Sequence, residues 1–318
     1  MLRISHTVAA RPTGNLLRCR MLFLAGLCII LTWSTAAQSA GREVLLPYGR
    51  IDLVGRLDLA PGKTLADGVV LMLHGTTAHG EMGIMRQFSG LFNENGLNTL
   101  AINFSLNESR RRGMFDCARP SSHRAEDALP EIGAWLDWLK GQGAGGVVLF
   151  GFSRGGHQAA WFDAERPHAL VKSMVLLAPV AANDFALPER YQARFKAPIA
   201  PVLAKARKLA QAGKGGARLE KIGFLNCDAA TATAASFLSY YDLPARNDTP
   251  ELLKRTRTPA LVLVAGSDEI ARDSEQRLGP LMDGARLRMK VVAGADHFFR
   301  DLFGEDAMEA IMEHLRPK

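Results

Sequence analysis

VVLFGFSRGGHQAAW, residues 147–161, is the stretch that decides the fold of this chain. Its apolar start at 147–150 predicts a buried strand, and the residues after Gly155 predict a helix that begins at once. Between them the pattern Gly-x-Ser-x-Gly occupies 151–155. In a strand–turn–helix setting this pattern is typical of a nucleophile elbow, with Ser153 at its tip. We therefore expect Ser153 on a strained turn that presents its hydroxyl for chemistry.

Three glycines around this serine fit a close approach of the strand and the helix. Gly151 and Gly155 have no Cβ to collide at the turn, and Gly156 lets the helix lie close to the sheet. The turn also aims the first amides of the helix at the space in front of the serine. That arrangement favours an oxyanion there.

The composition is that of a globular protein. The chain has 318 residues, 47% hydrophobic and 22% charged, which suits one large domain or one domain with an insertion. The net charge is +7, but four arginines and no acid lie in residues 1–39, so the remainder carries +3. This balance gives little support for a nucleic-acid partner, and we expect none.

Residues 1–39 are typical of a signal peptide. A basic stretch ends at Arg20, an apolar run follows at 21–33, and small residues occupy 34–40. The apolar run is short for a membrane span. We therefore expect export to the periplasm or secretion, with no stable membrane span after cleavage; an uncleaved membrane anchor is the alternative.

Export also determines which cysteines remain in the mature chain and whether they can form a disulfide. Cys19 and Cys28 would leave with the signal peptide, so Cys117 and Cys227 remain as one candidate disulfide pair in an oxidising compartment. Sequence alone does not show whether these two approach within bonding distance.

Strands and helices alternate along most of the mature chain. Strands are predicted at 43–46, 51–59, 69–73, 97–104, 147–150, 170–178, 260–265 and 287–292, and helices at 82–94, up to Lys140, after the elbow to about Pro167, and at 270–282 and 303–315. The alternation indicates an α/β fold, in which a mostly parallel central sheet carries helices on both faces. We assign this core to residues 40–180 and 258–318.

Residues 181–257 interrupt the alternation. They contain helical patterns around 200–212 and 229–240 but no convincing core strand. A structureless excursion of this length is uncommon in a compact domain. We therefore expect a helical cap inserted over the active site.

A serine nucleophile needs a base to accept its proton and a further group to orient that base. In an open α/β sheet such partners follow the carboxyl ends of strands, which face one crevice. Asp268 follows one predicted strand and His297 follows the next, in the order Ser, Asp, His that accompanies an elbow serine. Glu269, and Asp184 after the preceding strand, remain alternatives for the acid.

Together these pieces resemble the α/β-hydrolase superfamily. The matching motifs are HGTTAHG at 74–80, GFSRG at 151–155, VAGSDE at 264–269 and GADHFF at 294–299. With the strand order, they cover nearly all of the mature chain except the cap. The elbow and the last motif look most like the dienelactone-hydrolase-like and serine-peptidase-like esterase groups. The former often uses a cysteine nucleophile, which this elbow lacks.

The resemblance implies a role for each residue. Ser153 attacks a carbonyl carbon, and His297 accepts its proton and later activates the water that clears the acyl-enzyme. Asp268 holds the imidazole tautomer. The backbone N–H groups of Thr76 and Arg154 bind the oxyanion.

We expect neither a metal nor a cofactor. The histidines, cysteines and acids lack metal-ligand spacing, and the glycines at 141–146 lack a dinucleotide-binding arrangement. Arg110, Arg111, Arg112 and Arg119 lie in one loop near the predicted crevice. This run favours a solvated loop, and attraction of an anionic substrate is the alternative.

The sequence thus predicts an exported serine hydrolase that cleaves a small-molecule carboxylic ester, with an amide as the alternative substrate. An acyltransferase on the same three residues and a non-catalytic binding protein on the same scaffold are the alternatives. Neither the substrate nor the oligomeric state follows from the sequence.

Overall fold

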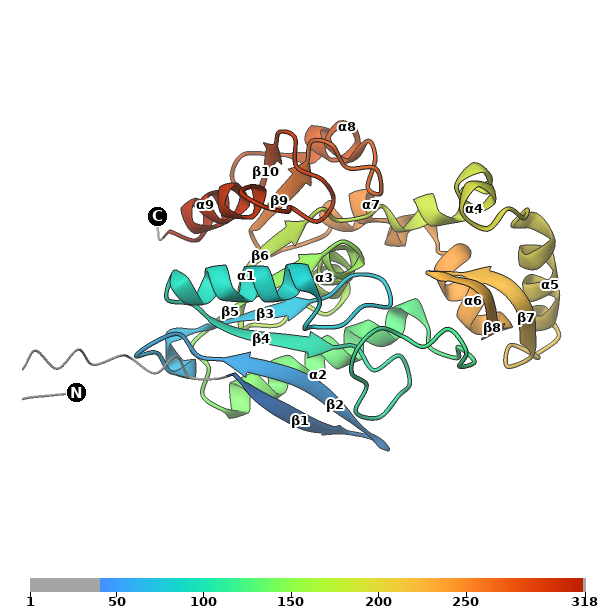
Figure 1. Cartoon of the computed structure of the whole chain (residues 1–318), viewed down its shortest axis with the longest axis horizontal. Helices are drawn as coiled ribbons and strands as arrows, with labels where there is room; N and C mark the ends of the chain where they lie inside the picture. The colour runs from blue at the N-terminus through green and yellow to red at the C-terminus, as the bar shows by residue number, and fades with distance from the viewer. Residues whose placement is uncertain (1–40, 317–318) are drawn as a thin grey trace, which may run out of the picture. The chain divides into compact units, whose positions relative to one another are not determined.

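The computed structural model of the chain describes residues 41–316. A central sheet has the strand order β1-β2-β4-β3-β5-β6-β9-β10 (Figure 1). Its strands are β1 (Arg42–Tyr48), β2 (Ile51–Asp58), β3 (Val69–Leu73), β4 (Asn98–Asn103), β5 (Val147–Phe152), β6 (Val171–Leu177), β9 (Ala260–Ala265) and β10 (Leu287–Val292). Strand β2 is antiparallel to β1 and β4, and the other neighbours are parallel. The predicted α/β fold is therefore confirmed; the predicted signal peptide at 1–39 lies outside the described residues.

Helices cover both faces of this sheet because its strands are apolar on both sides. In β3, Val70 and Met72 pack into one hydrophobic cluster and Leu71 and Leu73 into the other, as the two-residue period of a strand requires. The helices α1 (Gly83–Glu94) and α9 (Phe303–Leu315) bury their apolar faces in the first cluster. The second cluster includes the inner faces of α2 (Ala128–Gly141) and α3 (Arg154–Glu165).

The segment 181–257 leaves the core after β6. It contains η3 (Ala182–Ala186), α4 (Pro188–Phe195), α5 (Ala200–Gln211), β7 (Arg218–Phe224), β8 (Cys227–Thr233), α6 (Ala234–Tyr241), η4 (Ala245–Asn247) and α7 (Thr249–Leu253). Strands β7 and β8 form a separate antiparallel pair, which lies with α5 and α6 (Figure 1). We refer to this segment as the cap.

The cap differs from the purely helical insertion that the sequence predicts. The predicted helix at 229–240 starts only at Ala234, because the residues before it pair with β7. Ala230 and Ala232 alternate with more exposed neighbours, as expected for a strand. Thr233 then caps the helix, since its hydroxyl accepts the N–H of Ser236 at 3.1 Å.

The predicted helix at 270–282 is also wrong in extent. The structure has a short helix, α8 (Ser274–Leu278), followed by a 3₁₀ turn, η5 (Gly279–Leu281). Asp273 precedes α8 in the left-handed region at φ 59°, which breaks any earlier helical turn. Pro280 has no N–H to donate, so the α-helical hydrogen bonds do not continue through it.

The loop after β4 is fastened to the cap. A disulfide joins Cys117 to Cys227, with a Cα–Cα distance of 5.5 Å. Beside it, Ser121 N donates to Thr231 O at 2.8 Å and Thr233 N donates to Ser121 O at 2.9 Å.

In the part of the chain that the structure describes, no helix has the length and apolar character needed to span a membrane.

Candidate active site

Ser153 lies at the turn between β5 and α3. Its backbone has φ 56° and ψ −118°, a conformation that costs a non-glycine residue about 1–3 kcal/mol. Its N–H donates to Leu177 O at 2.8 Å, which ties the strained turn to the neighbouring strand β6. The strained turn predicted from the sequence is therefore present.

The glycines of the elbow have no space for a side chain. A Cβ on Gly151 would contact the backbone oxygen of Gly155, and a Cβ on Gly155 would contact the backbone oxygen of Leu73. A Cβ on Gly156 would lie 3.0 Å from Pro179. Strand and helix therefore approach as closely as backbone atoms allow, which fixes the position of the serine between them.

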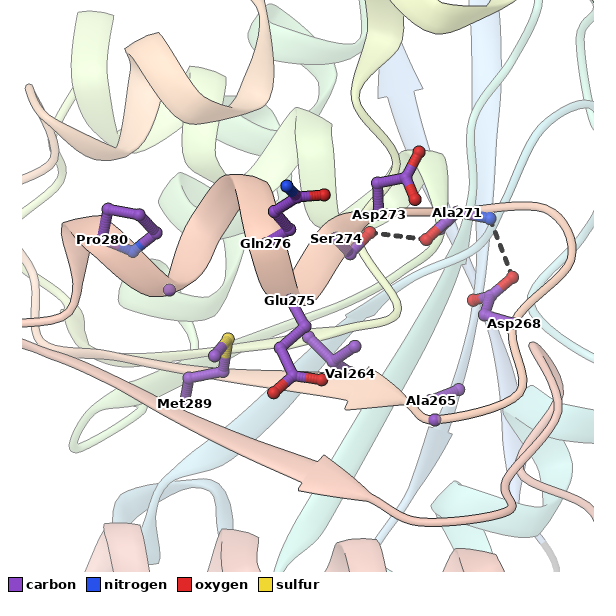
Figure 2. Close-up of a pocket in the computed structure, with 12 residues that line it drawn as sticks. Val264, Ala265, Asp268, Ala271, Asp273, Ser274, Glu275, Gln276, Pro280 and Met289 are labelled. Carbon is purple, nitrogen blue, oxygen red and sulfur yellow. Dashed lines mark hydrogen bonds between the residues drawn. The ribbon is translucent and has the colours of Figure 1, made fainter.

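His297 and Asp268 come together from the loops after β10 and β9. His297 Nδ1 donates to Asp268 Oδ2 at 2.7 Å, and both side chains are buried. The other carboxylate oxygen accepts the N–H groups of Ile270 at 2.7 Å and Ala271 at 2.8 Å; Figure 2 shows the second of these bonds. Burial acts to raise the pKa of Asp268, but these hydrogen bonds and the nearby imidazole outweigh it and lower the pKa.

The two other acids left open by the sequence lie elsewhere. Asp184 pairs with Arg277 at 2.6 Å and with Arg190 at 3.7 Å. Glu269 has an exposed side chain. Of the three candidates, Asp268 is thus the one that orients His297.

The imidazole of His297 lies beside the elbow. Its ring centroid is 5.1 Å from that of Phe152, the residue before Ser153. Within residues 41–316 the hydrogen bond of the His297 ring is the one to Asp268, and none joins it to Ser153 Oγ. Because Nδ1 bonds to Asp268, Nε2 is the ring nitrogen that remains for a further partner.

The loop after β3 is held by a buried histidine. His74 Nδ1 donates to Gly75 O at 2.8 Å, and Nε2 faces Phe104 N at 3.1 Å and Arg111 Nη2 at 3.0 Å as an acceptor. Burial, with the nearby Arg111 cation, lowers the pKa of His74 well below its usual value. His74 is therefore a neutral structural residue. A Cβ on Gly75 would lie 3.3 Å from the Cβ of Ser153, so this loop abuts the nucleophile.

The arginine-rich loop after β4 is only partly the solvated loop that the sequence favours. Arg110, Arg112 and Arg119 are exposed and pair with Asp52, Glu43 and Glu108 at 2.8, 2.6 and 3.2 Å. None of these three is a free cation that faces substrate.

Arg111 is the exception in that loop, because its side chain is buried. Besides His74, it donates to the backbone oxygens of Phe104, Gly113 and Ala78 at 2.6, 2.7 and 2.8 Å. The prediction of a solvated arginine was wrong here. A run of arginines carries no local signal that one member turns inward.

Thr76 and Arg154, whose N–H groups were predicted to bind an oxyanion, meet through their side chains. Arg154 Nε donates to Thr76 Oγ1 at 3.0 Å. Asn226, at the tip of the β7–β8 hairpin, donates to Thr76 O at 3.0 Å, so the cap also reaches this loop. The sequence predicted a role for the backbone of Arg154 but not the burial of its guanidinium.

A larger cavity lies on the side of Asp268, away from the candidate nucleophile. It has a volume of about 560 Å³ and lies along β9 and α8, lined in part by Asp268, Glu275 and Met289 (Figure 2). Neither Ser153 nor His297 lines it.

Among the described residues, no group of His, Cys, Asp and Glu side chains is arranged to hold a metal ion.

A strained serine elbow and a His–Asp pair on adjacent strand ends define the architecture of the α/β hydrolases. The model of the Alpha/beta hydrolase family matches residues 70–313, and the chain belongs to this family. No curated protein sequence matches the chain.

Solved structures share the fold at low sequence identity. Est1E from Butyrivibrio proteoclasticus aligns with TM-score 0.61 and 16% identity, over 87% of this chain and 99% of that one. A monoacylglycerol lipase from Paleococcus ferrophilus gives 0.58 and 21%, over 83% and 98%. The esterase Pf2001 from Pyrococcus furiosus gives 0.54 and 16%, over 87% and 92%.

Proposed function

We propose that this α/β hydrolase is a serine hydrolase that cleaves a carboxylic ester of a small molecule, without a cofactor. The observation that carries the proposal is the hydrogen bond of 2.7 Å between His297 and Asp268, beside the strained turn that presents Ser153. A buried carboxylate bonded to Nδ1 fixes the tautomer of the neutral imidazole, in which the opposite ring nitrogen is the proton acceptor.

The mechanism follows from these positions. Ser153 Oγ attacks the ester carbonyl while His297 Nε2 takes its proton, and the imidazolium then protonates the leaving alcohol. A water activated by the same nitrogen cleaves the acyl-enzyme. Asp268 stabilises the imidazolium in both steps.

The oxyanion of each step would bind the N–H groups of Thr76 and Arg154. Arg154 is the first residue of α3, where backbone donors have no partner within the helix. Loss of one such donor typically costs about 3 kcal/mol of transition-state stabilisation.

Solved structures with the same fold are consistent with ester chemistry. One is a monoacylglycerol lipase and another is an esterase. At 21% and 16% identity they support the reaction class, and they do not indicate the substrate.

We also propose that the protein is exported. Two features support this: the signal-like pattern of residues 1–39 and the disulfide between Cys117 and Cys227, which suits an oxidising compartment. The intact mass of protein recovered outside the cytoplasm tests the proposal. A chain that begins near residue 40 supports cleavage, whereas a full-length chain found only in the cytoplasm contradicts export.

The nucleophile is tested by Ser153→Ala, with the exposed Ser122→Ala as a matched control. We expect the first variant to lose labelling by a fluorophosphonate probe and hydrolysis of p-nitrophenyl butyrate, and the control to keep both. Full turnover in Ser153→Ala would refute the mechanism. Native protein that neither labels nor hydrolyses any ester would favour a binding protein on this scaffold.

A further inference from the structure

Arg154 is a buried cation for which the described residues supply no anion. The residue is 4% exposed, its Nε donates to the neutral hydroxyl of Thr76, and its Nη2 is buried without an acceptor. Buried charges in proteins are normally paired, because loss of hydration without a counter-charge costs several kcal/mol. An unpaired guanidinium on the residue that follows the candidate nucleophile therefore needs an explanation.

The neighbouring aromatic rings hold the guanidinium without neutralising it. Its central carbon lies 4.9 Å from the ring centroid of Phe185 and 5.3 Å from that of Tyr240, distances typical of cation–π contacts. Burial lowers the pKa of Arg154. Arginine starts so far above neutrality that it remains charged. Both rings belong to the cap, so the cation lies where cap and core meet.

The histidines around Arg154 do not compete for an anion. Burial, with the nearby Arg154 cation, lowers the pKa of His157 to about 3. Burial, with Arg111 and Arg154, lowers the pKa of His123 to about 3 as well. Both rings are therefore neutral, and the positive charge at this junction is that of the arginines.

A small cavity adjoins this cation. Its lining includes Arg154, Thr76 and Gly75 on the core side and Leu225 and Tyr240 on the cap side. Gly75 also abuts Ser153, so the cavity is separated from the nucleophile by one residue of the loop. The cavity has a volume of about 10 Å³, close to that of one water molecule. A carboxylate is larger than one water molecule, so the walls of the cavity would have to move to admit it.

We propose that Arg154 binds a carboxylate of the substrate, so that the preferred esters carry a negative charge a few bonds from the scissile carbonyl. This inference rests on the proposed ester hydrolysis. A carboxylate would satisfy Nη2 and neutralise the guanidinium, as in the bidentate pairs that arginine forms with carboxylates. The carboxylate belongs either to the acyl part or to the alcohol part of the ester, and substrates that carry it on one part or the other distinguish the two.

The test compares three small esters, and a pH-stat measures the acid that each releases on hydrolysis. Ethyl butyrate is the neutral reference, monoethyl glutarate adds a carboxylate to the acyl part, and (butanoyloxy)acetate adds one to the alcohol part. We expect native kcat/KM for one of the two anions to exceed that of ethyl butyrate by about tenfold to a hundredfold, the range for a hydrogen bond to a charged group.

The variants test whether Arg154 causes the preference. Arg154→Met should reduce the ratio of anionic to neutral kcat/KM by about tenfold or more, and Arg154→Lys should restore part of it. Arg166→Met, which removes an exposed charge just after the same helix, is the matched control and should leave the ratio unchanged. A ratio unaffected by Arg154→Met, with both substrates slowed equally, would overturn the inference, because the side chain would then serve only the oxyanion loop.

Native protein gives a readout that does not depend on the folding of a variant. Competitive inhibition by glutarate but not by glutaramide supports the inference. Hydrolysis of ethyl butyrate with no preference for either anion and no inhibition by glutarate would overturn it and leave ester hydrolysis standing. Failure to hydrolyse any of the three esters, together with absent fluorophosphonate labelling, would instead contradict the proposed function.

Discussion

A single carboxylate sets the orientation of the His297 ring. Asp268 accepts Nδ1–H with one oxygen and uses the other to hold the two backbone N–H groups that follow it in its own loop. The loop after β9 thus fixes the acid before the acid fixes the base. A change at Asp268 should therefore alter the tautomer and the orientation of the imidazole together.

Asp268→Asn tests this dependence. The amide can donate where the carboxylate accepted, which favours the wrong imidazole tautomer, and we expect kcat on p-nitrophenyl butyrate to fall by about 10³- to 10⁴-fold. Glu269→Gln, at the exposed neighbouring acid, is the control and should retain native kcat. If the two variants exchanged these outcomes, the assignment of the acid would be wrong.

Glu131 is a buried carboxyl with a different consequence. It accepts hydrogen bonds from Ser105 N at 2.8 Å and from Ser105 Oγ at 2.5 Å, and so ties α2 to the end of β4. Burial raises the pKa of Glu131 from 4.5 to about 7, although the bonds from Ser105 act to lower it. The folded chain therefore keeps this proton over a range of pH in which the unfolded chain has lost it.

The sign of the pH effect follows from that difference. Glu131 contributes its full share of stability below pH 4.5, the value expected in the unfolded chain, and this share is lost as pH rises to about 7. The loss is roughly 3 kcal/mol. Glu131→Gln removes the titration. The unfolding free energy of the variant minus that of the native chain should therefore increase as pH rises from about 4.5 to about 7.5. Urea unfolding measures this; an identical pH profile for both proteins would contradict it, and the exposed Glu94→Gln is the control.

Arg154 and Arg111 show what sequence reasoning misses about individual residues. Ser153, Asp268 and His297 could be predicted as a site because each follows a strand that the local sequence pattern indicates. Burial of an arginine depends instead on segments distant in sequence: Tyr240 of the cap covers the first, and the second bonds to His74 and Ala78. No pattern near either arginine indicates that its charge turns inward.

The geometry of the elbow depends on the close contact between β5 and α3. Gly151 and Gly155 face each other so closely that a single methyl group on Gly151 would overlap the peptide oxygen of Gly155. The strain at Ser153 persists because strand and helix are each held by the rest of the sheet. Adding a methyl group at this contact should therefore act on the whole element pair.

Gly151→Ala should destabilise the protein by about 1–3 kcal/mol or more, the usual cost of overpacking. It should also lower kcat, because the serine is displaced. Gly90→Ala adds the same methyl group in α1, where no atom lies within 4 Å of the new Cβ. This control should gain about 0.5–1 kcal/mol from helix propensity. Thermal melting and ester turnover measure both variants; a native-like melting temperature and rate for Gly151→Ala would show that the contact is not tight.

The accuracy of the predicted elements follows from how locally each one is determined. The strands β3, β9 and β10 occupy the predicted residues. Strands β3 and β9 are short apolar runs bounded by turn residues, whereas β10, LRMKVV, alternates apolar and charged residues over its first four positions. Strand β8 was missed because CDAATAT has helix-forming alanines, and pairing with β7 overrides that propensity. Local composition identifies a strand buried on both faces far better than a hairpin stabilised by its partner.

At the level of the whole molecule, the cap and the core meet around the candidate site. Asn226 of the cap hairpin bonds to Thr76, and Phe185 and Tyr240 enclose the guanidinium of Arg154. The same hairpin carries Cys227, whose disulfide partner lies in the loop after β4. The covalent link therefore acts on the junction that forms the small cavity beside Arg154.

Replacing both cysteines by serine should lower the stability of the protein. The disulfide joins positions 110 residues apart, and closing a loop of that size restricts the unfolded chain enough to account for about 2–5 kcal/mol. Guanidinium unfolding of oxidised native protein and of the double variant Cys117→Ser, Cys227→Ser measures the difference. Dithiothreitol should destabilise the native chain to the level of the variant and leave the variant itself unchanged. Equal midpoints for oxidised native protein and variant would mean that the backbone hydrogen bonds of Ser121 to the hairpin hold cap and core together without the disulfide.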